Sequence, residues 1–535
     1  VDAAFLNSSQ SYEQAQEVEW RLQSGQITLL YVAPERLVTP RFLGLLDALY
    51  AQGQLALFAI DEAHCVSQWG HDFRPEYRAL TVLHERYAGV PRIALTATAD
   101  DLTRADLIER LQLEDARLFI SSFDRPNIRY RIEEKKDVTT QLLRFIEREH
   151  AGEAGVVYCQ SRKRVEELAA TLCDAGITAL PYHAGLDTKV RQKNQDRFLR
   201  EEGIVMVATI AFGMGIDKPD VRFVAHVDMP KNIEGYYQET GRAGRDGLNA
   251  DAWMAYGLND VVNQRRMIDE SPAGEEFKQA LRGKLDALLA LAEATDCRRV
   301  RLLAYFGEKS TPCGNCDNCL NPPAVWDATD AARKLLSTIY RVNQASGISF
   351  GTGHIMDILR GKKTEKVAQF GHEKISTFGI GADLTEPQLR GVLRQLIATG
   401  AVGLQKVMLD SGHSFDTLCL TEGSRAVLKG EVPVQLRESV SSAPAKRTRK
   451  SSAPPAAAAN LGPDAQVRFI NLKAWRAEVA REHNLPAYVI FHDATLAAIA
   501  ERNPGTLEDL QGISGMGAKK LEAYGAEVLR VCQQS

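Results

Sequence analysis

The sequence predicts an α/β protein in which two parallel-sheet units precede a cysteine-rich segment and two mainly helical modules. Three observations support this fold class. Short apolar runs alternate with amphipathic helical patterns over the first half of the chain, as they do in βαβ units. Four of the nine cysteines fall between positions 297 and 319. Helical patterns return after this cluster, and a segment rich in Ser, Ala and Pro interrupts them.

The length of 535 residues is too great for a single core, and about three to five domains are expected. We place the α/β units at 1–118 and 119–257, the cysteine-rich segment at 258–324, the first helical module at 325–436, a linker at 437–463 and the terminal module at 464–535. The sequence contains neither a run of about 18 apolar residues nor a signal peptide. We therefore expect a cytoplasmic protein without a membrane partner. The net charge of −4 implies that any nucleic-acid site is a local patch.

The first unit contains three apolar runs that predict parallel strands: Ile27–Ala33, Leu55–Ile60 and Arg92–Leu95. The run Leu55–Ile60 is typical of a strand that is buried on both faces. It ends on Asp61 and Glu62, at the sheet edge where α/β proteins bind ligands. Carboxylates at that edge suit Mg²⁺ binding and the activation of an attacking water. An acidic pair that merely ends a strand is the alternative interpretation.

Thr96 and Thr98 follow the third run. Hydroxyl residues at a strand end are typical of turns, but polar strand ends that converge on one edge make a site more credible. A phosphate-cradling loop of the form G-x-x-x-x-G-K-[ST] does not occur in the sequence. Because the chain begins abruptly at Val1, we expect it to be a fragment.

The second unit repeats the alternation of apolar runs and helical patterns. Strands are predicted at Gly155–Tyr158, Ile204–Ala208 and Phe223–Val227, and helices at Ser161–Leu172 and Asp187–Leu199. This order again predicts a parallel sheet.

The segment YYQETGRAGRDG is the most informative part of the second unit. On a single helix, Gln238, Arg242 and Arg245 would share one face. Gly241 and Gly244 would then lie inside the helix, at a cost of about 1 kcal/mol each, which indicates a close approach to the backbone. Two arginine guanidinium groups and a glutamine amide are suited to bind the oxygens of a triphosphate. A solvent-exposed cationic helix is the alternative.

Asp217 ends the segment FGMGID, which follows the second predicted strand of this unit. Its glycines permit tight turns. The carboxylate of Asp217 has two candidate roles, which are to accept a hydrogen bond from a ribose hydroxyl or to position a neighbouring arginine.

The cysteine cluster has the spacing C-x2-C-x2-C at Cys313, Cys316 and Cys319, and Cys297 lies upstream. Four thiolates satisfy the tetrahedral coordination of Zn²⁺ and leave no open position, so we predict a structural zinc site. An iron–sulfur cluster and a site without metal are the alternatives. The absence of a further cysteine shortly after Cys319 favours zinc over the cluster.

The first helical module combines predicted helices at Asp327–Asn343 and Glu386–Thr399 with a hairpin at Val402–Leu409 and Ser414–Leu420. Helices followed by a hairpin indicate a winged helix, although a generic packing domain fits equally well.

The terminal module contains a Gly-rich turn that precedes a helix beginning at Ala518, with Lys519 and Lys520 in its first turn. Amides at a helix N-terminus and two lysines suit a nucleic-acid phosphate, and a plain helix-capping turn is the alternative.

The ordered motifs APERL, DEAH, ALTATAD, SSFDRPNIRY, VYCQSRKRVEELA, YHAGL, ATIAFGMGIDKP and YYQETGRAGRDG resemble those of superfamily 2 helicases. The loop CVSQWGHDFRPEY is similar to that of the RecQ family of DNA helicases in particular. The resemblance covers essentially the whole chain. It implies two RecA-like domains, of which the first is incomplete, then a zinc-binding subdomain, a winged helix and a small all-α HRDC domain. It also places the phosphate-cradling loop upstream of Val1.

The resemblance implies roles for individual residues. Asp61 would help to hold Mg²⁺, Glu62 would be the catalytic base, and His64 would couple the site to neighbouring motifs. Arg242 and Arg245 would contact the γ-phosphate and supply the arginine finger. The candidate cofactor-binding residues are Gln238, Asp217, Thr96 and Thr98.

The loop CVSQWGHDFRPEY, residues 65–77, is called the aromatic-rich loop below. The resemblance implies a role for it, because in this family it links single-strand binding to hydrolysis. Aromatic rings stack on bases, and arginine adds phosphate or cation–π contacts. Packing aromatics are the alternative. The candidate DNA-binding residues are Trp69, His71, Phe73, Arg74, Lys519 and Lys520.

The leading hypothesis from the sequence is an ATP-dependent 3′→5′ DNA helicase of recombination and repair, with ATP, Mg²⁺ and Zn²⁺ as cofactors. Its expected partners are single-stranded and junction or duplex DNA, with a single-strand-binding protein as a candidate protein partner. We expect a nucleoid-associated monomer. The rival hypotheses are a non-catalytic DNA-binding protein and an RNA helicase.

Overall fold

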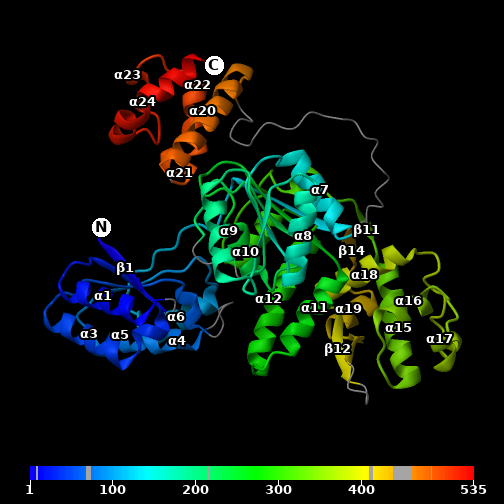
Figure 1. The fold of residues 1–535 in the computed structure, drawn as a ribbon. Helices are drawn as coiled ribbons and strands as arrows, with labels where there is room; N and C mark the ends of the chain where they lie inside the picture. The colour runs from blue at the N-terminus through cyan, green and yellow to red at the C-terminus, as the bar shows by residue number, and fades with distance from the viewer. Residues whose placement is uncertain are drawn as a thin grey trace. The chain divides into compact units, whose positions relative to one another are not determined.

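The computed structural model describes residues 1–7, 10–67, 74–210, 212–213, 216–408, 414–437, 461–483 and 485–534, and the side chains of 406–408 and 414–416 are left out (Figure 1). The chain divides into two compact units, each of which is described by itself. Unit 1 comprises Val1–Phe123, Ala273–Leu281 and Leu303–Glu308, and unit 2 comprises Asp124–Pro272, Arg282–Leu302 and Lys309–Ser535. No helix among the described residues is long and apolar enough to cross a membrane.

Unit 1 alternates short strands with helices. Its elements are β1 (Ala3–Leu6), α1 (Tyr12–Gln23), β2 (Leu29–Val32), α2 (Pro34–Leu37), α3 (Pro40–Ala51), β3 (Phe58–Ile60), the 3-10 helix η1 (Ala63–Val66), α4 (Pro75–Arg78), η2 (Ala79–Thr81), α5 (Val82–Arg86), β4 (Arg92–Ala94) and α6 (Asp101–Arg110). The three predicted strands are confirmed as β2, β3 and β4, whereas the sequence did not reveal β1. The pairs β1–β2 and β3–β4 are both parallel.

The strands of unit 1 are more exposed than the sequence predicts. The expectation that Leu55–Ile60 is buried on both faces is wrong, because only Ile60 in this run is buried and Leu57 is 56% exposed. The physical reason is that β3 pairs with β4 alone among the described residues. The core of the unit lies on the side of Ile60, which packs in one cluster with buried side chains of α3, including Phe42 and Leu46.

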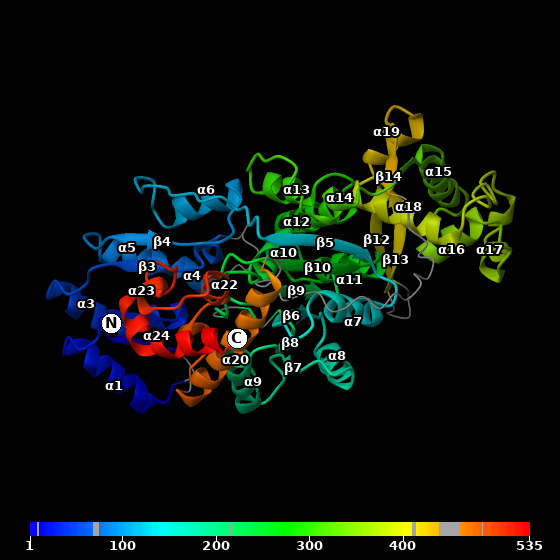
Figure 2. The same cartoon turned by 90° about the horizontal axis from the view of Figure 1, so that it is seen from above.

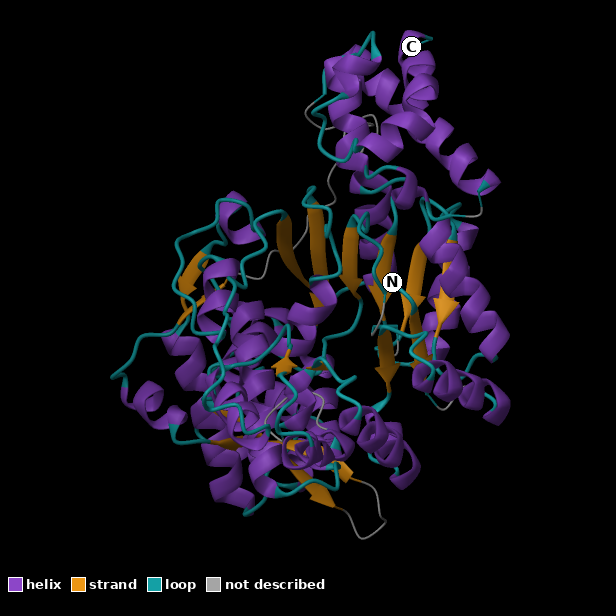
Figure 3. Ribbon diagram, turned by 90° about the vertical axis from the view of Figure 1, so that its left-hand side faces the viewer, coloured by secondary structure: helices purple, strands orange, loops and turns teal. Residues whose placement is uncertain are grey.

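Unit 2 begins with a six-stranded sheet and the helices that connect its strands. The elements are β5 (Ile128–Glu134), α7 (Val138–Glu149), β6 (Gly155–Tyr158), α8 (Arg162–Asp174), β7 (Ala179–Tyr182), α9 (Thr188–Arg200), β8 (Val205–Ala208), β9 (Phe223–His226), α10 (Ile233–Thr240), β10 (Ala250–Tyr256) and α11 (Leu258–Asp269). All of the strands are parallel, in the order β5-β10-β9-β6-β8-β7, and the labels in Figure 2 run in the same order. Figure 3 shows them as neighbouring arrows.

The predictions for this sheet are confirmed for β6, β8, β9, α8 and α9, whereas β5, β7 and β10 were not predicted. Every residue of β6, β8, β9 and β10 is buried. The packing is close: a Cβ on Gly155 would lie 2.1 Å from the ring of Phe223 on the adjacent strand.

The segment that follows contains the cysteine cluster and the first helical module. Its elements are α12 (Glu275–Glu293), α13 (Arg298–Tyr305), α14 (Asp317–Leu320), β11 (Val325–Asp327), α15 (Thr329–Ser346), α16 (Thr352–Leu359), α17 (Glu365–Gln369), η3 (His372–Lys374), α18 (Glu386–Ala398), β12 (Val402–Met408), β13 (Ser414–Leu420), α19 (Gly423–Lys429) and β14 (Gln435–Arg437). The predicted helices are confirmed as α15 and α18, and β12 and β13 form the predicted antiparallel hairpin. This arrangement of helices and hairpin is that of a winged helix.

The terminal module is all-helical, as predicted. It comprises α20 (Pro463–Glu482), α21 (Ala487–Ile490), α22 (Asp493–Arg502), α23 (Leu507–Leu510) and α24 (Ala518–Gln533). Its core contains Phe469, Trp475 and Phe491 together with aliphatic side chains of α22 and α24.

Candidate active site and metal centre

The acidic pair of unit 1 lies where β3 gives way to η1. Asp61 is exposed, and its carboxylate accepts a hydrogen bond from the N–H of Glu62 at 2.9 Å. Glu62 has a φ of 47°, in the left-handed region that a side chain with a Cβ seldom adopts. Such strain persists only where the surroundings enforce it, and it concentrates at functional sites. The conformation sharply turns the chain immediately after the strand.

His64 connects the acidic pair to the threonine segment. Its Nδ1 lies 3.2 Å from Glu62 Oε2 and 3.0 Å from Thr96 Oγ1, and its side chain is only 2% exposed. Thr96 Oγ1 also accepts from the N–H of Thr98 at 3.3 Å. The backbone brings these segments together, because Ala63 N–H donates to Leu95 O at 2.9 Å. The polar ends of β3 and β4 therefore lie together within unit 1, as predicted for these two of the three strands.

The aromatic-rich loop starts and ends beside the acidic pair. Arg74 N–H donates to Cys65 O at 3.0 Å, so the two ends of the loop meet next to η1. Burial raises the pKa of Tyr77, the last residue of the loop, to about 12. The candidate DNA-binding residues Trp69, His71 and Phe73 lie outside the described residues.

The arginine segment of unit 2 does not form the single helix predicted from YYQETGRAGRDG. Helix α10 ends at Thr240, Gly241 is its C-cap, and Gly244 has a φ of 56°. The two glycines therefore terminate a helix and form a turn, because a left-handed residue such as Gly244 cannot continue an α-helix. We call residues 241–247 the arginine loop.

The side chains of the arginine loop are held against neighbouring segments of unit 2. A Cβ on Gly213 would lie 3.1 Å from Arg242 Nη2, so the guanidinium of Arg242 closely approaches this glycine. Arg245 Nη1 donates to Asp217 Oδ1 at 2.8 Å and to Ile216 O at 3.1 Å. Asp217 therefore contacts a neighbouring arginine, which is one of the two roles considered for it. Gln238 lies on α10 and is half-buried.

Two residues that the sequence interpretation did not select hold the backbone of the arginine loop. Arg125 donates to the carbonyls of Gly241, Ala243 and Gly244 at 2.9–3.0 Å. Asn127 Nδ2 donates to the carbonyls of Gly244 and Leu248 at 2.7 and 2.8 Å. The motif SSFDRPNIRY was the available signal, but its residues lie more than a hundred positions before the loop.

The four cysteines converge in a geometry that fits a tetrahedral metal. The Sγ atoms of Cys297, Cys313, Cys316 and Cys319 all lie within 4.8 Å of one another. The Cys313–Cys319 and Cys316–Cys297 sulfur pairs are 3.9 and 4.0 Å apart, near the ~3.8 Å that four sulfurs at about 2.3 Å from one zinc ion require. The residues therefore fit Zn²⁺.

The backbone around Cys297 favours the thiolate form that binds metal, whereas burial raises the pKa of Cys313 and of Cys319. Burial acts to raise the pKa of Cys297, but the N–H groups of Cys313 and Val300 donate to its sulfur and lower the pKa to about 7. Cys313 in turn accepts from the N–H groups of Asn315 and Cys316. Hydrogen bonds to the charged form stabilise it, as a zinc ligand requires.

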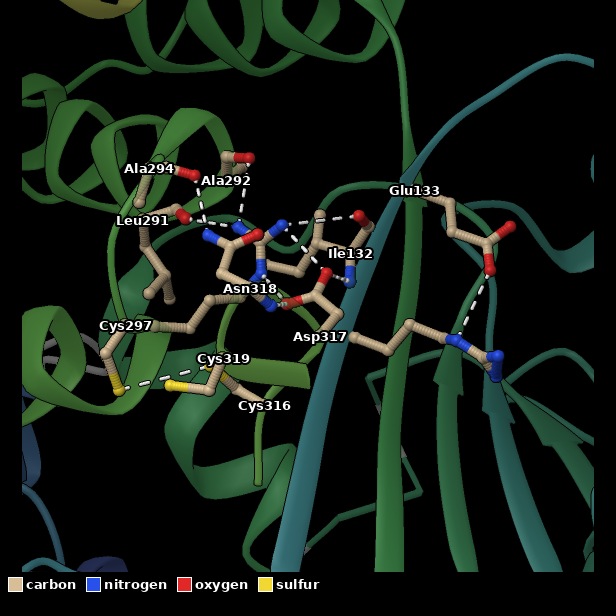
Figure 4. A network of polar contacts seen from close by, with 12 residues as sticks. Ile132, Glu133, Leu291, Ala292, Ala294, Cys297, Cys316, Asp317, Asn318 and Cys319 are labelled. Atoms are coloured by element: carbon tan, nitrogen blue, oxygen red, sulfur yellow. Dashed lines mark hydrogen bonds and ion pairs between the residues drawn. The ribbon is translucent and has the colours of Figure 1, made fainter. Parts of the chain in front are cut away.

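The cysteine loop is fastened to the edge of the six-stranded sheet. Asp317, between Cys316 and Cys319, accepts from the N–H of Ile132 on β5 at 3.0 Å (Figure 4). Arg298, directly after Cys297, makes two hydrogen bonds to the Asp317 carboxylate at 2.6 and 2.9 Å and is 1% exposed. Because β5 is an edge strand, this contact also satisfies one of its outward-facing amides.

The two lysines of the terminal module differ in their surroundings. Lys519 is exposed, whereas Lys520 Nζ lies 5.2 Å from the centroid of the buried Phe491 ring, and burial lowers the pKa of Lys520. In the preceding turn, a Cβ on Gly515 would lie 2.2 Å from Thr495 Oγ1. A close approach within the module thus accounts for that glycine.

Comparison with family models first defines the class. Residues 134–247 match the helicase conserved C-terminal domain, and 258–320 match the RecQ zinc-binding domain. Residues 322–445 match the RQC domain and 465–532 match the HRDC domain. The α/β sheet with its arginine loop and the four-cysteine centre are therefore parts of a helicase-type chain.

Whole-chain relatives then identify the family. The chain is 43% identical over 535 residues to the ATP-dependent DNA helicase RecQ of Haemophilus influenzae, covering all of this chain and 83% of that protein. Proteins of the same name from Pasteurella multocida and Bacillus subtilis are 42% and 35% identical, with all of this chain and 81% and 85% of the relatives covered. The chain belongs to the RecQ family.

Proposed function

We propose that this chain is an ATP-dependent DNA helicase that couples ATP hydrolysis to strand separation in recombination and repair. The observation that carries the proposal is the cluster around His64, whose imidazole lies within 3.2 Å of both Glu62 and Thr96. A carboxylate oriented in this way is suited to activate a water for attack on a phosphate. The relatives that align with the whole of this chain are named ATP-dependent DNA helicases.

The roles that we propose follow the chemistry of each side chain. Asp61, which is exposed at the strand end, contributes a carboxylate oxygen to Mg²⁺, and Glu62 is the general base. Arg242 and Arg245 stabilise charge on the γ-phosphate, with Gln238 as a further phosphate contact. Thr96 and Thr98 hold His64 and the acidic pair in position.

The phosphate-cradling function requires a segment that this sequence does not contain. The motif G-x-x-x-x-G-K-[ST] is absent from residues 1–535. We propose that hydrolysis appears when a segment with this motif precedes Val1, and we call that protein the extended chain. The proposed domain boundaries are those given above, with 1–118 as the part that the added segment completes.

The DNA contacts are proposed to come from three places. The aromatic-rich loop would contact single-stranded DNA. The first helical module, which contains the hairpin β12–β13, would contact duplex or junction DNA. The terminal module would add phosphate contacts, chiefly through Lys519, since Lys520 is engaged with Phe491. A monomeric state and binding of a single-strand-binding protein are further proposals, which sedimentation with and without that protein tests.

The direct test is ATP hydrolysis by the extended chain, with and without single-stranded DNA. DNA should stimulate hydrolysis, and Glu62→Gln should lower kcat by about 10²–10⁴-fold, the usual contribution of a general base. The matched control is Glu17→Gln, which changes an exposed carboxylate of α1 and should leave kcat unaltered. Hydrolysis that survives Glu62→Gln would refute the assignment of the base, and an extended chain that binds DNA without hydrolysing ATP would favour the non-catalytic alternative.

A further inference from the structure

The arginine loop has no regular secondary structure of its own, so its position depends on contacts from other segments. Its backbone is tied to residues 219–221, because Gly244 N–H donates to Val221 O at 2.8 Å and Asp246 N–H donates to Pro219 O at 3.3 Å. The Asp246 side chain also pairs with Arg222 at 2.6 Å. The carbonyls of Gly241, Ala243 and Gly244 accept hydrogen bonds from the segment Asp124–Asn127, which we call the strut.

The strut grips the loop through two side chains. Arg125 binds three successive parts of the loop backbone, at Gly241, Ala243 and Gly244. Asn127 packs so tightly that a Cβ on Gly244 would lie 2.4 Å from its Nδ2. Charge-assisted hydrogen bonds to carbonyls are stronger than neutral ones, and the planar guanidinium of Arg125 fixes their relative directions.

The other side of the strut is held by the cysteine centre. Arg299, two positions after Cys297, donates to the carbonyls of Pro126 at 3.3 Å and Ile128 at 2.7 Å. It also pairs with Asp124 at 3.3 Å, and its side chain is 7% exposed. Asn315, between Cys313 and Cys316, donates to the same Pro126 carbonyl at 3.4 Å.

We propose that Arg125 and Asn127 are positioning residues through which the zinc centre holds the arginine loop in place. Arg299 and Asn315, which flank the cysteines, each contact the strut directly, and the strut contacts Gly241–Gly244. Bound zinc would fix this end of the contacts, since Arg299 and Asn315 both lie within two residues of a cysteine ligand. The functional meaning of the loop rests on the proposed helicase function, whereas the mechanical coupling does not.

Hydrogen exchange on the zinc-loaded chain, without nucleotide, tests the coupling directly. In Arg125→Gln, the amides of Gly244 and Asp246 should exchange at least about tenfold faster, as expected when the three charge-assisted hydrogen bonds of Arg125 are weakened or lost. Arg125→Lys keeps the charge but not the fork and should give a smaller increase. The control Arg144→Gln changes an exposed arginine of α7 and should leave the loop unaltered.

The zinc end of the strut is tested by Arg299→Gln. This variant should retain its zinc by metal analysis and still accelerate exchange in the loop, while removal of zinc from the unaltered chain should accelerate it at least as much. Amides of β10 serve as the internal reference, because a change confined to the loop excludes general unfolding. Loop exchange that stays constant in both Arg125→Gln and Arg299→Gln, with zinc bound, would overturn the proposal.

The extended chain supplies a functional readout. Because Arg125 acts through the loop and not on substrate, Arg125→Lys should lower kcat about tenfold while the KM for ATP changes less than about twofold. A rise in KM at constant kcat would contradict a positioning role. If the extended chain hydrolyses no ATP at all, the proposed function fails, and the exchange experiment still decides whether the strut exists.

Discussion

The parallel strands of the two units differ in how completely they are covered. In unit 2, every residue of the four strands β6, β8, β9 and β10 is buried. In unit 1, Leu29, Tyr31, Leu57 and Ile93 on β2, β4 and the approach to β3 are 42–63% exposed. Both units nevertheless form their candidate site segments, which are the His64 cluster in one and the arginine loop in the other. Local site geometry therefore depends on nearby hydrogen bonds more than on completion of the sheet.

The largest expected effect concerns the cysteine centre that fastens the edge of the sheet in unit 2. Cys316→Ser should abolish stoichiometric zinc binding. Because the free energy of zinc binding also stabilises the fold, the variant should lose stabilisation on the order of 10 kcal/mol. Metal analysis together with hydrogen exchange of β5 and α14 measures this. The control Cys173→Ser changes an exposed thiol and should retain zinc. Equal protection of β5 with and without zinc would contradict the role of the centre at this edge.

One glycine-to-alanine substitution in each unit tests how closely the residues around that position are packed. Gly155→Ala places a Cβ 2.1 Å from the Phe223 ring and should lower the free energy of unfolding of unit 2 by about 3 kcal/mol. Gly44→Ala, in the interior of α3 with no atom within 4 Å of the new Cβ, should raise that of unit 1 by about 0.5–1 kcal/mol. Urea unfolding measures both. Similar effects of the two variants would contradict the difference in packing between these two positions.

Substitution of one buried and one exposed apolar residue tests the same difference in burial between the units. Val207→Thr should cost about 1–3 kcal/mol, because it buries a hydroxyl in β8. Leu57→Thr should change stability by less than about 0.5 kcal/mol in the present chain. A loss from Leu57→Thr as large as that from Val207→Thr would contradict the difference in exposure.

A further expected effect is a pH dependence of the stability of unit 2. Burial lowers the pKa of His354 to about 4, and its Nε2 lies 2.8 Å from His372 Nδ1, with Lys366 and Glu373 also nearby. Between pH 6.5 and 4 the unfolded chain binds a proton that the folded module excludes, so stability is full above pH 6.5 and falls as the pH falls. The loss should be on the order of 1 kcal/mol at pH 5 after allowance for solvent screening. His354→Gln should reduce this difference in urea unfolding at pH 7.5 and 5, and an unchanged difference would assign it to other groups.

The sequence predicted the elements whose signal is local. The apolar runs that became β6, β8 and β9 are short, continuous and bounded by polar residues, and the cysteine spacing specifies its metal geometry. In contrast, β5 and β10 alternate or mix polar and apolar residues, such as Arg129 and Asp251, which pair with each other across the two strands. Such pairs become visible only when the strands lie side by side.

The candidate site shows the same limit. The acidic pair and the arginines were found from their motifs, but YYQETGRAGRDG was assigned to one helix because its spacing fits a helical face. The left-handed φ of Gly244 depends on the close approach of Asn127, which lies 117 positions earlier in the chain. The contact of His64 with Thr96 similarly joins residues 32 positions apart. Sequence spacing contains no direct record of either contact.

The central claim, that this chain is the motor part of a DNA helicase, is tested most directly by strand separation on a forked duplex that carries a fluorophore and a quencher. We predict that the extended chain separates the strands when ATP and Mg²⁺ are present, and that its Glu62→Gln variant binds the fork with similar affinity but does not separate them. Strand separation by the Glu62→Gln variant, or fork binding by the extended chain without any ATP-dependent separation, would contradict this account.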